Sequence, residues 1–531
     1  MAATLGTIPQ EVLEHIAFFS ATQAFLGPPS ALVPLLSTCR RIHSRLSINA
    51  NHHLYANVFA HKFDIAPVIR RLGPDRTTPY ILARELQRRC FYLKRIRGRL
   101  DSTVKVSREA DDGDYDGGTL HGLLSNAYIL MLENEGKNEQ QLREYGKIDT
   151  WLKDYWFEEL GASRAKASIR MDIWLPDTGE RSLAMWLFWF LLKPNDYMKD
   201  NKDSWTALNI LKVFALGAHK YDLTRPSWVD FAPVTSAIKA KAGIYYSEAW
   251  RLTPPPLATP AILSYLTLVN QLTDGVRHTP LTPSHSSVVI RRSHEWECEW
   301  GRCLSLGQPD CDKLLTDSFR PGSIEGVWEG VFTYTEFTAY AALLTGAPPQ
   351  TLQKSIVVRH RQTWKLREHH LIAADPYSDS GIDMDLDTVD PLPAGDPLRS
   401  YFPTGTQIRE HREGIEVQEA NCKNILHYQR ARTTSRQRSD DDCYTVCVQD
   451  VIITGEGHSA WGQFNLIGRI RPCDGFVSLS KEYVDGDRGK WLYRGYLVGN
   501  IHGNLAGRWR DTLSPADVPG YEGCFAMSRR R

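Results

Sequence analysis

The segments FVSLSKEY (476–483) and WLYRGYLVG (491–499) decide the fold class of the C-terminal region. Each segment either alternates apolar with polar residues or is rich in β-branched and aromatic residues. Both patterns are typical of strands. Asp474-Gly475 precedes the first segment and Asp485-Gly486 follows it, and both dipeptides favour hairpin turns. Six further segments share the pattern: GVWEGVFTYTEF (326–337), SIVVRHRQTW (355–364), NILHYQR (424–430), CYTVCVQDVII (443–453), SAWGQFNLIGRI (459–470) and LAGRWRD (505–511). Many short antiparallel strands predict a barrel or a sandwich over residues 319–531.

An acidic insertion interrupts these predicted strands at residues 374–400. Seven aspartates stand there among Pro, Ser and Gly residues: Asp375, Asp379, Asp383, Asp385, Asp387, Asp390 and Asp396. A segment with this much charge and so few apolar residues cannot bury a core, so we expect it to be disordered.

The middle of the chain, residues 119–318, has a helical character. Leucines and aromatic residues are widely spaced in IDTWLKDYWFEEL (148–160) and SWTALNILKVFALG (204–217), and Pro/Gly-rich segments separate such stretches. No fixed repeat period is visible, so the sequence gives no support to a solenoid. We therefore expect an all-α spacer domain.

Residues 66–118 combine a basic helix with an acidic linker. Nine Lys and Arg residues lie between Arg84 and Arg108, and EADDGDYDGG (109–118) then reverses the sign of the charge. The usual meaning of such a basic run is a solvated helix face; contact with an acidic partner protein or with phosphates is the alternative. Because only Phe91 and Tyr92 are interleaved with the basic residues, we expect no nucleic-acid partner.

The first sixty residues contain three short amphipathic segments. Pro9 suits the first helical position, and Glu11 complements the positive end of the helix dipole. Val12, Leu13 and Ile16 then form one apolar stripe. In the second segment the apolar residues follow three-and-four spacing and are Leu32, Leu35, Leu36, Cys39, Ile42 and Leu46. So small a unit buries little surface, and such stripes are typical of a docking module.

This N-terminal pattern resembles the F-box. The opening Leu-Pro-x-Glu-hydrophobic pattern of that family is represented by Ile8-Pro9-Gln10-Glu11-Val12, and its later hydrophobic-Cys-Arg segment by Ser37 to Ile42. The resemblance covers about residues 5–64 and implies a three-helix F-box domain over residues 1–65. It also implies that this domain binds the Skp adaptor of a cullin–RING ubiquitin ligase. The implied adaptor-binding residues are Ile8, Pro9, Glu11, Val12, Ile16, Leu32, Leu35, Leu36, Cys39 and Ile42.

Two tryptophan motifs of the C-terminal region are similar to those of the calycins, the lipocalin-like barrels. Gly326-Val327-Trp328 opens the first predicted strand, and Arg508-Trp509-Arg510 lies in a late strand. The resemblance implies that Trp328 packs beneath Arg508 and closes one end of a barrel. Polar and aromatic groups on the strands and loops are the candidate substrate-binding residues: Tyr334, Arg359, Arg361, Trp364, His458 and Trp461. Each of these also suits a solvated face or a packed core.

Composition excludes several classes of protein. The 531 residues carry 63 Lys and Arg against 62 Asp and Glu, and the longest apolar run, residues 183–192, is too short to span a bilayer. The N-terminus lacks the basic and apolar regions of a signal peptide, so we expect an intracellular protein of the cytoplasm or nucleus.

His294, Cys298, Cys303 and Cys311 have no zinc-knuckle spacing, and Walker, nucleophile-elbow and zincin motifs are missing. We expect no metal, no cofactor and no catalysis.

The sequence thus predicts a multidomain α+β chain with a receptor function. In the first hypothesis it is the substrate-recognition subunit of a ubiquitin ligase, with the adaptor at the F-box and a protein substrate at the β-domain. The alternative is a calycin-like protein that binds a small ligand and has no role in ubiquitination. A third possibility, an enzyme built on the β-domain, has no set of residues to support it.

Overall fold

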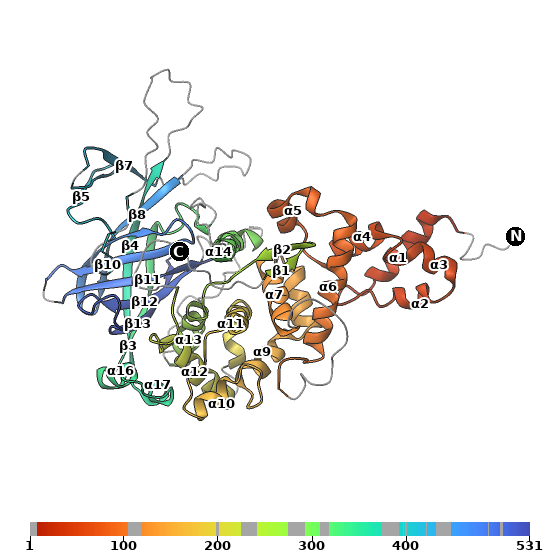
Figure 1. The fold of residues 1–531 in the computed structure, drawn as a ribbon, viewed down its shortest axis with the longest axis horizontal. Coiled ribbons are helices and arrows are strands. Elements are labelled where there is room, and N and C mark those ends of the chain that lie inside the picture. Colours follow the sequence, from red (N-terminus) through yellow and green to blue (C-terminus); the bar gives the residue numbers. More distant parts are fainter. Residues whose placement is uncertain are drawn as a thin grey trace, which may run out of the picture.

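The computed structural model joins an α-helical half to a β-barrel (Figure 1). It describes residues 8–104, 119–197, 201–224, 242–273, 292–307, 318–372, 392–393, 395–396, 398, 401–420, 422–431, 448–486, 488–499 and 503–530. The N-terminal helices and the barrel lie at opposite ends of the molecule, with the other helices between them (Figure 1). The predicted mixture of α and β structure is confirmed.

Four helices form the N-terminal end: α1 (Gln10–Thr22), α2 (Leu32–Leu36), α3 (Arg40–Leu46) and α4 (His52–Lys62). Pro9 occupies the N-cap of α1, directly before its first turn. Leu13, Ala17 and Ala21 are buried, because four-residue spacing places them on the stripe of α1 that faces the other helices. Lys62 at the end of α4 donates to backbone carbonyls in the loop after α1, which ties the two helices together.

The middle helices lie between the N-terminal helices and the barrel (Figure 1). They are α5 (Ala66–Leu72), α6 (Pro79–Arg97), α7 (Thr119–Leu132), α8 (Lys137–Gln140), α9 (Ile148–Phe157), α10 (Ala165–Arg170), α11 (Gly179–Leu191), α12 (Asn201–Leu216), α13 (Ala258–Thr273) and α14 (Glu297–Gly307). The basic helix α6 is solvated only in part, since Arg89 and Arg95 are buried and Arg95 pairs with Asp101 at 2.9 Å. Arg84 and Lys94 keep the exposed face that the sequence predicts.

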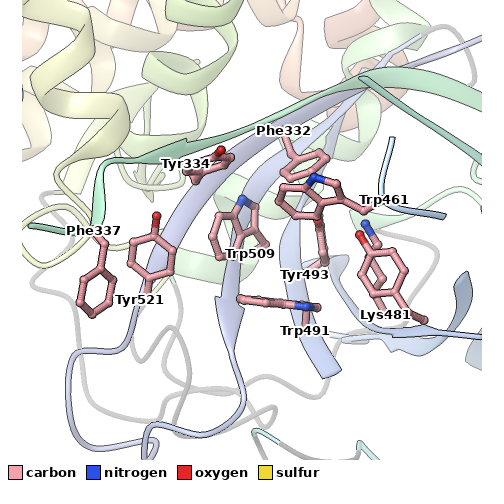
Figure 2. Close-up of a pocket in the computed structure, with 10 residues that line it drawn as sticks. Phe332, Tyr334, Phe337, Trp461, Lys481, Trp491, Tyr493, Trp509 and Tyr521 are labelled. Atoms are coloured by element: carbon pink, nitrogen blue, oxygen red, sulfur yellow. The ribbon is translucent and has the colours of Figure 1, made fainter. Parts of the chain in front are cut away.

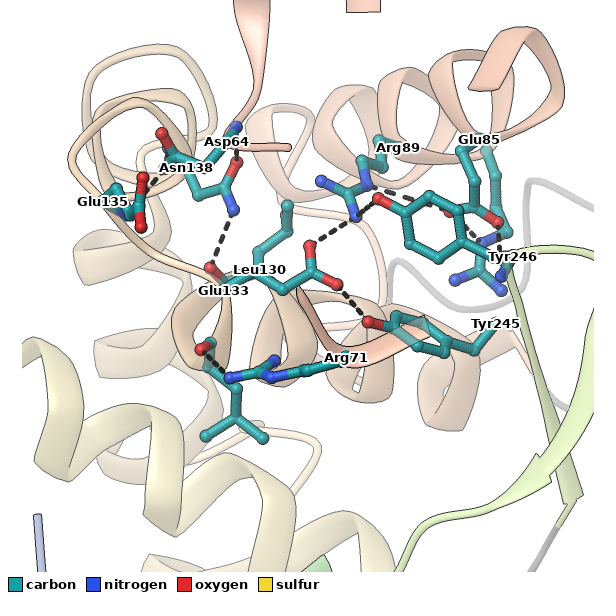
Figure 3. Close-up of polar contacts among 12 residues, drawn as sticks. Asp64, Arg71, Glu85, Arg89, Leu130, Glu133, Glu135, Asn138, Tyr245 and Tyr246 are labelled. Carbon is teal, nitrogen blue, oxygen red and sulfur yellow. Dashed lines mark hydrogen bonds and ion pairs between the residues drawn. The ribbon is translucent and has the colours of Figure 1, made fainter. Parts of the chain in front are cut away.

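A buried polar network connects these middle helices (Figure 3). Arg89 of α6 donates to Glu133, after α7, at 2.6 Å and to the hydroxyl of Tyr246 at 2.9 Å. Tyr245 donates to the other oxygen of Glu133 at 2.6 Å, and Glu85 accepts the backbone N–H of Tyr246 at 3.2 Å. A buried charge is tolerated when it is paired and hydrogen-bonded, so this network holds the helices in one arrangement.

The expectation that the middle region is entirely helical is wrong. The two tyrosines of the network belong to a hairpin of β1 (Ala242–Tyr245) and β2 (Glu248–Arg251), which pair antiparallel. Tyr246 and Ser247 form its turn with positive φ angles of 48° and 64°. The strands are four residues long, which is the lower limit of the length over which alternation indicates a strand.

Eight antiparallel strands form a closed barrel in the C-terminal half (Figure 1). They are β3 (Gly326–Thr335), β4 (Val357–Ile372), β8 (Val448–Ser459), β9 (Gly462–Ile470), β10 (Phe476–Tyr483), β11 (Lys490–Val498), β12 (Asn504–Asp511) and β13 (Glu522–Arg529). Each strand pairs with the next, and β13 returns to pair with β3. The predicted hairpin between β9 and β10 is present, with Gly475 at a φ of 69° in its turn.

Strand β4 takes part in more than the barrel wall. Its first part pairs with β3, and near its end His369 and His370 pair instead with β7 (Ile425–Arg430). That strand continues a small antiparallel sheet through β6 (Gly414–Gln418) to β5 (Gln407–Glu410). Two short helices, α16 (Phe337–Leu344) and α17 (Gln350–Lys354), connect β3 to β4.

The inner face of the barrel wall is largely buried, and so is the outer face of β10, β11, β12 and β13. Inward residues such as Phe332, Leu479 and Phe525 form one apolar core inside the barrel. Outward residues such as Phe476 and Ala506 belong instead to the core that the helices form. The helical half and the barrel therefore share packed side chains.

Polar contacts also join the helices to the barrel. Arg302 of α14 donates to the backbone carbonyl of Asp474 at 2.8 Å, and its guanidinium lies 4.6 Å from the centre of the Tyr496 ring. The Asp474 carboxylate accepts from Arg471 and from the hydroxyl of Tyr496, at 2.5 and 2.7 Å. Arg471 also donates to Thr224, after α12, at 2.9 Å. These buried contacts fix the barrel against the helices.

Two of the predicted segments lie outside the described residues. The acidic linker at 109–118 is one, and most of the insertion at 374–400 is the other; Leu392 and Leu398 within it are described and buried. Among the helices that the structure describes, none has the length and apolar character needed to cross a membrane.

Candidate functional site

One end of the barrel holds an aromatic cavity of about 230 Å³ (Figure 2). We call this the open end and name the opposite end, where β3 begins, the closed end. The cavity is lined by nine aromatic side chains and one lysine: Phe332, Tyr334, Phe337, Trp461, Tyr483, Trp491, Tyr493, Trp509, Tyr521 and Lys481. In Figure 2, Phe337 and Tyr521 lie at one side of the cavity and Lys481 at the other.

Strand periodicity brings these side chains together. Phe332 and Tyr334 are two residues apart in β3, as are Lys481 and Tyr483 in β10, so each pair faces the same side of its strand. The rings contact one another edge to face: for example, Trp491 and Trp509 on neighbouring strands have centroids 5.2 Å apart with planes at 85°. Such packing fixes the rings without filling the space between them.

Lys481 is the charged group in this lining, and its side chain is almost fully buried, with 1% relative exposure. Its ammonium nitrogen lies 3.9 Å from the centre of the Phe464 ring and 4.9, 5.1 and 5.4 Å from those of Tyr483, Phe332 and Tyr493. It donates to the side-chain oxygen of Gln362 at 3.4 Å. In the part of the chain that the structure describes, no carboxylate forms an ion pair with Lys481.

Burial lowers the pKa of Lys481 to about 7, since the charged form loses its hydration. Burial also raises the pKa of Tyr483 and Tyr493, which therefore stay neutral near pH 7. His360, which stacks on Tyr334 at the same end with centroids 5.5 Å apart, has its pKa lowered by burial. Lys481 is thus the cavity group whose charge changes near neutral pH.

The closed end is filled by side chains. Trp328 is fully buried there, and its ring nitrogen donates to the carbonyl of Ile324 at 2.7 Å. The predicted partner Arg508 does not lie over it. Arg508 faces the outer side of β12 and donates to the carbonyls of Phe214 and Ala215 at the end of α12, at 3.4 and 3.1 Å.

The arginine that lies over Trp328 is Arg529, whose guanidinium is 5.9 Å from the ring. Arg529 pairs with Trp328 across β13 and β3. The calycin resemblance assigns this place to Arg508, in a late strand, but alternation along β12 turns Trp509 inward and Arg508 outward. The role predicted for Arg508 is therefore corrected.

The structure brings together two of the six predicted substrate-binding residues. Tyr334 and Trp461 both line the cavity, with ring centroids 6.0 Å apart. Trp364 is fully buried deeper in the barrel, where it contacts Tyr493 at 5.4 Å.

The other three predicted residues are on the outer wall. Arg359 donates to Asn270 of α13 at 2.9 Å, which makes it part of the contact with the helices. Arg361 and His458 are exposed on β4 and β8, away from the cavity. Alternation places all three on the opposite side of their strands from the cavity lining.

Lys481 was missed as a site residue, although the sequence carries a signal for it. In FVSLSKEY, positions 477, 479, 481 and 483 form one face, and Val477, Leu479 and Tyr483 are apolar or aromatic. A lysine on the apolar face of a strand is unusual, because burying its charge costs free energy. That exception identifies Lys481 without knowledge of the structure.

A second surface of interest lies on the N-terminal helices. Val12, Ile16 and Phe19 of α1 are exposed to 47%, 37% and 69%, and Val33 of α2 to 61%. We call Val12, Ile16 and Phe19 the outer stripe of α1. Their spacing places them on one face, distinct from the buried stripe that contains Leu13. The single stripe predicted for Val12, Leu13 and Ile16 is therefore two.

The structure separates the predicted adaptor-binding residues into exposed and core positions. Pro9, Glu11, Val12, Ile16 and Cys39 are exposed, while Ile8, Leu35 and Leu36 are half-buried. Leu32 and Ile42 are each only 2% exposed and pack in the core. These two are unavailable to a partner, because their spacing reflects the inner face of the helices.

Among the residues that the structure describes, no group of His, Cys, Asp and Glu has a geometry that could hold a metal ion. Cys303, one of the four considered from sequence, lies 3.1 Å from the hydroxyl of Tyr128 in the helical core. Cys311 lies outside the described residues.

Comparison of this chain with protein families, with curated proteins and with solved structures finds no match in any of the three. The cavity and the outer stripe of α1 are therefore the two features of the molecule that bear on its function.

Proposed function

We propose that this chain is the substrate-recognition subunit of an SCF-type cullin–RING ubiquitin ligase. The N-terminal helices would bind the Skp adaptor as an F-box, and the barrel would bind a protein substrate. The observation that carries the proposal is the outer stripe of α1, together with the F-box resemblance of the same residues.

The outer stripe is a surface without a partner in the described chain. Val12, Ile16 and Phe19 lie in succession along α1, and Val33 of α2 is also exposed. Exposed apolar residues that gather on one face are typical of a protein–protein contact, whereas scattered ones need no explanation. The half-buried Leu35 and Leu36 extend the apolar character of α2.

The middle helices suit a spacer that fixes distance and direction. The Arg89–Glu133 network lies within them, and Arg302 and Arg471 tie them to the barrel. A receptor of this kind performs no bond chemistry. It raises the effective concentration of its substrate near the ubiquitin-loaded enzyme, and a rigid spacer preserves that advantage.

The barrel supplies a substrate-binding end in this proposal. Its strand order, in which each strand pairs with its neighbour in sequence, is similar to that of the calycins. The rim of the open end, where Phe337 is 70% exposed, is suited to an apolar segment of a protein.

Co-purification of the full chain with a Skp adaptor tests the proposal. The wild-type chain should retain the adaptor, and the double variant Val12→Asp/Ile16→Asp should lose at least about tenfold in affinity, because two charges would be buried in the contact. Both side chains are exposed, so the variant should keep its helical circular dichroism and its melting temperature.

A matched control changes exposed apolar residues of the barrel. Val484→Asp/Leu513→Asp alters positions that are 60% and 94% exposed, and it should retain the adaptor fully. Failure of the wild-type chain to bind the adaptor, or equal binding by the Val12→Asp/Ile16→Asp variant, would show the proposal to be wrong.

A further inference from the structure

The buried Lys481 lacks a counter-charge among the described residues, and it faces a cavity that is otherwise aromatic. We propose that the open end of the barrel binds a small apolar carboxylate. The flat body of that molecule would pack among the rings, and its carboxylate would pair with Lys481. This inference goes beyond the proposed receptor function, and it does not depend on adaptor binding.

The need for an anion follows from the surroundings of the ammonium group. Four aromatic faces at 3.9–5.4 Å favour a cation, but ring quadrupoles carry no net charge. The amide oxygen of Gln362 at 3.4 Å is a neutral acceptor. A lysine buried in this way is costly until a carboxylate reaches it, so a ligand that brings one gains a charge-assisted hydrogen bond.

The class of ligand follows from the lining and the volume. Rings from Tyr334, Trp491, Trp509 and Tyr521 enclose a space of about 230 Å³. That volume lies below the roughly 300–1,000 Å³ of typical ligand pockets, which favours a small ligand, and aromatic walls favour a flat ring system over a long acyl chain. A bicyclic aromatic acid combines the required size, shape and charge.

Protonation of Lys481 should control the binding. The titratable groups facing it are Tyr483 on its own strand and Tyr493 on β11. His360 on β4 lies 5.0 Å from the Trp461 ring, and Arg488 lies 5.8 Å from the Tyr483 ring. The tyrosines have raised pKa values and His360 a lowered one. From weakly acid to weakly alkaline pH, Lys481 is therefore the group that loses its charge.

Calorimetry with the full chain tests the inference with two matched probes, 2-naphthoate and its neutral amide, 2-naphthamide. At about pH 6.5, naphthoate should bind at least about tenfold more tightly, the value of one good charged contact. At about pH 8.5 its affinity should fall more than about tenfold, since Lys481, with a pKa of about 7, is then mostly neutral. The affinity of naphthamide should stay within about twofold.

Lys481→Met should remove the preference for naphthoate and leave the binding of naphthamide nearly unchanged. Lys365→Met is the control, because Lys365 is 58% exposed on the outer wall and should behave as wild type. The pH series on the wild-type chain needs no variant, so a misfolded Lys481→Met protein would not prevent the test.

Equal binding of the two probes by the wild-type chain, or an unchanged preference in Lys481→Met, would overturn the inference. So would failure of the wild-type chain to bind naphthoate at all. Val12→Asp/Ile16→Asp should bind naphthoate as wild type does. Loss of adaptor binding and loss of carboxylate binding are thus separate results, and each proposal can fail alone.

Discussion

The two ends of the barrel each bury a charged side chain, and they treat it in opposite ways. At the closed end, Glu368 accepts hydrogen bonds from the backbone N–H groups of Gly322, Ile324 and Glu325 at 2.6, 2.5 and 3.1 Å. At the open end, Lys481 has one neutral acceptor and the faces of aromatic rings. A buried charge whose hydrogen bonds are all made within the chain stabilises the fold, whereas one with incomplete hydrogen bonding is available to a ligand.

The largest effect is expected at Glu368. Glu368→Ala leaves three backbone donors without their acceptor, so the free energy of unfolding should fall by about 3–4 kcal/mol. Urea denaturation measures the loss. Glu456→Ala removes a carboxylate that is 55% exposed on the outer wall, and it should cost less than about 1 kcal/mol. Equal losses of unfolding free energy in the two variants would show that the buried, hydrogen-bonded Glu368 contributes no more than an exposed carboxylate.

Lys481→Met should have the opposite sign and stabilise the protein by about 2 kcal/mol at weakly acid pH. The pKa of Lys481 is about 7 in the folded chain but about 10.4 when unfolded, so between these values the unfolded chain binds more protons. Burial of the charged Lys481 therefore lowers the free energy of unfolding by its full amount below pH 7, and this loss becomes smaller as the pH rises. Unfolding curves across this range should converge for wild type and variant, and parallel curves would contradict the prediction.

A smaller effect is expected at Arg529, which lies over Trp328 at the closed end. Arg529→Met should lower the free energy of unfolding by about 1 kcal/mol, because a cation–π contact is lost beside the buried Trp328. The neighbouring Arg530, 65% exposed and paired with Glu329, provides the control. If thermal unfolding shows that Arg530→Met lowers stability as much as Arg529→Met does, the contact between Arg529 and Trp328 adds nothing specific to stability.

The smallest effect on stability is expected at Phe337, which is 70% exposed at the rim of the cavity. Phe337→Ser should change the free energy of unfolding by less than about 0.5 kcal/mol. The same change should weaken naphthoate binding by roughly threefold, as part of the apolar contact is lost. Ile425→Ser, on β7, should leave the binding unchanged, and a similar loss there would show that the effect is unspecific.

Much of the fold could be predicted from the sequence, because one face of each barrel strand is regularly apolar. Alternation in FVSLSKEY and the Asp474-Gly475 turn were sufficient to predict the hairpin of β9 and β10. The barrel's outer contacts could not be predicted in this way. Arg508 and Arg359 look like surface residues until helices from earlier in the chain cover them.

Part of the candidate site could also be predicted, namely Tyr334 and Trp461. The rest of the lining requires knowledge of which face of each strand is inward, and Arg361 and His458 fall on the wrong one. On α1, periodicity alone cannot separate the buried Leu13 from the exposed Val12 and Ile16, since all three are apolar. The packing of the neighbouring helices decides that difference.

The core shared by the helices and the barrel bears on how the chain can be divided. Val331, Tyr496, Cys524 and other outward residues of the wall lie in the same apolar cluster as helices of the N-terminal half. A fragment cut before residue 319 would present this wall to water and should aggregate rather than fold. We therefore expect the helices and the barrel to unfold as one cooperative unit, although their sequence patterns suggest separable domains.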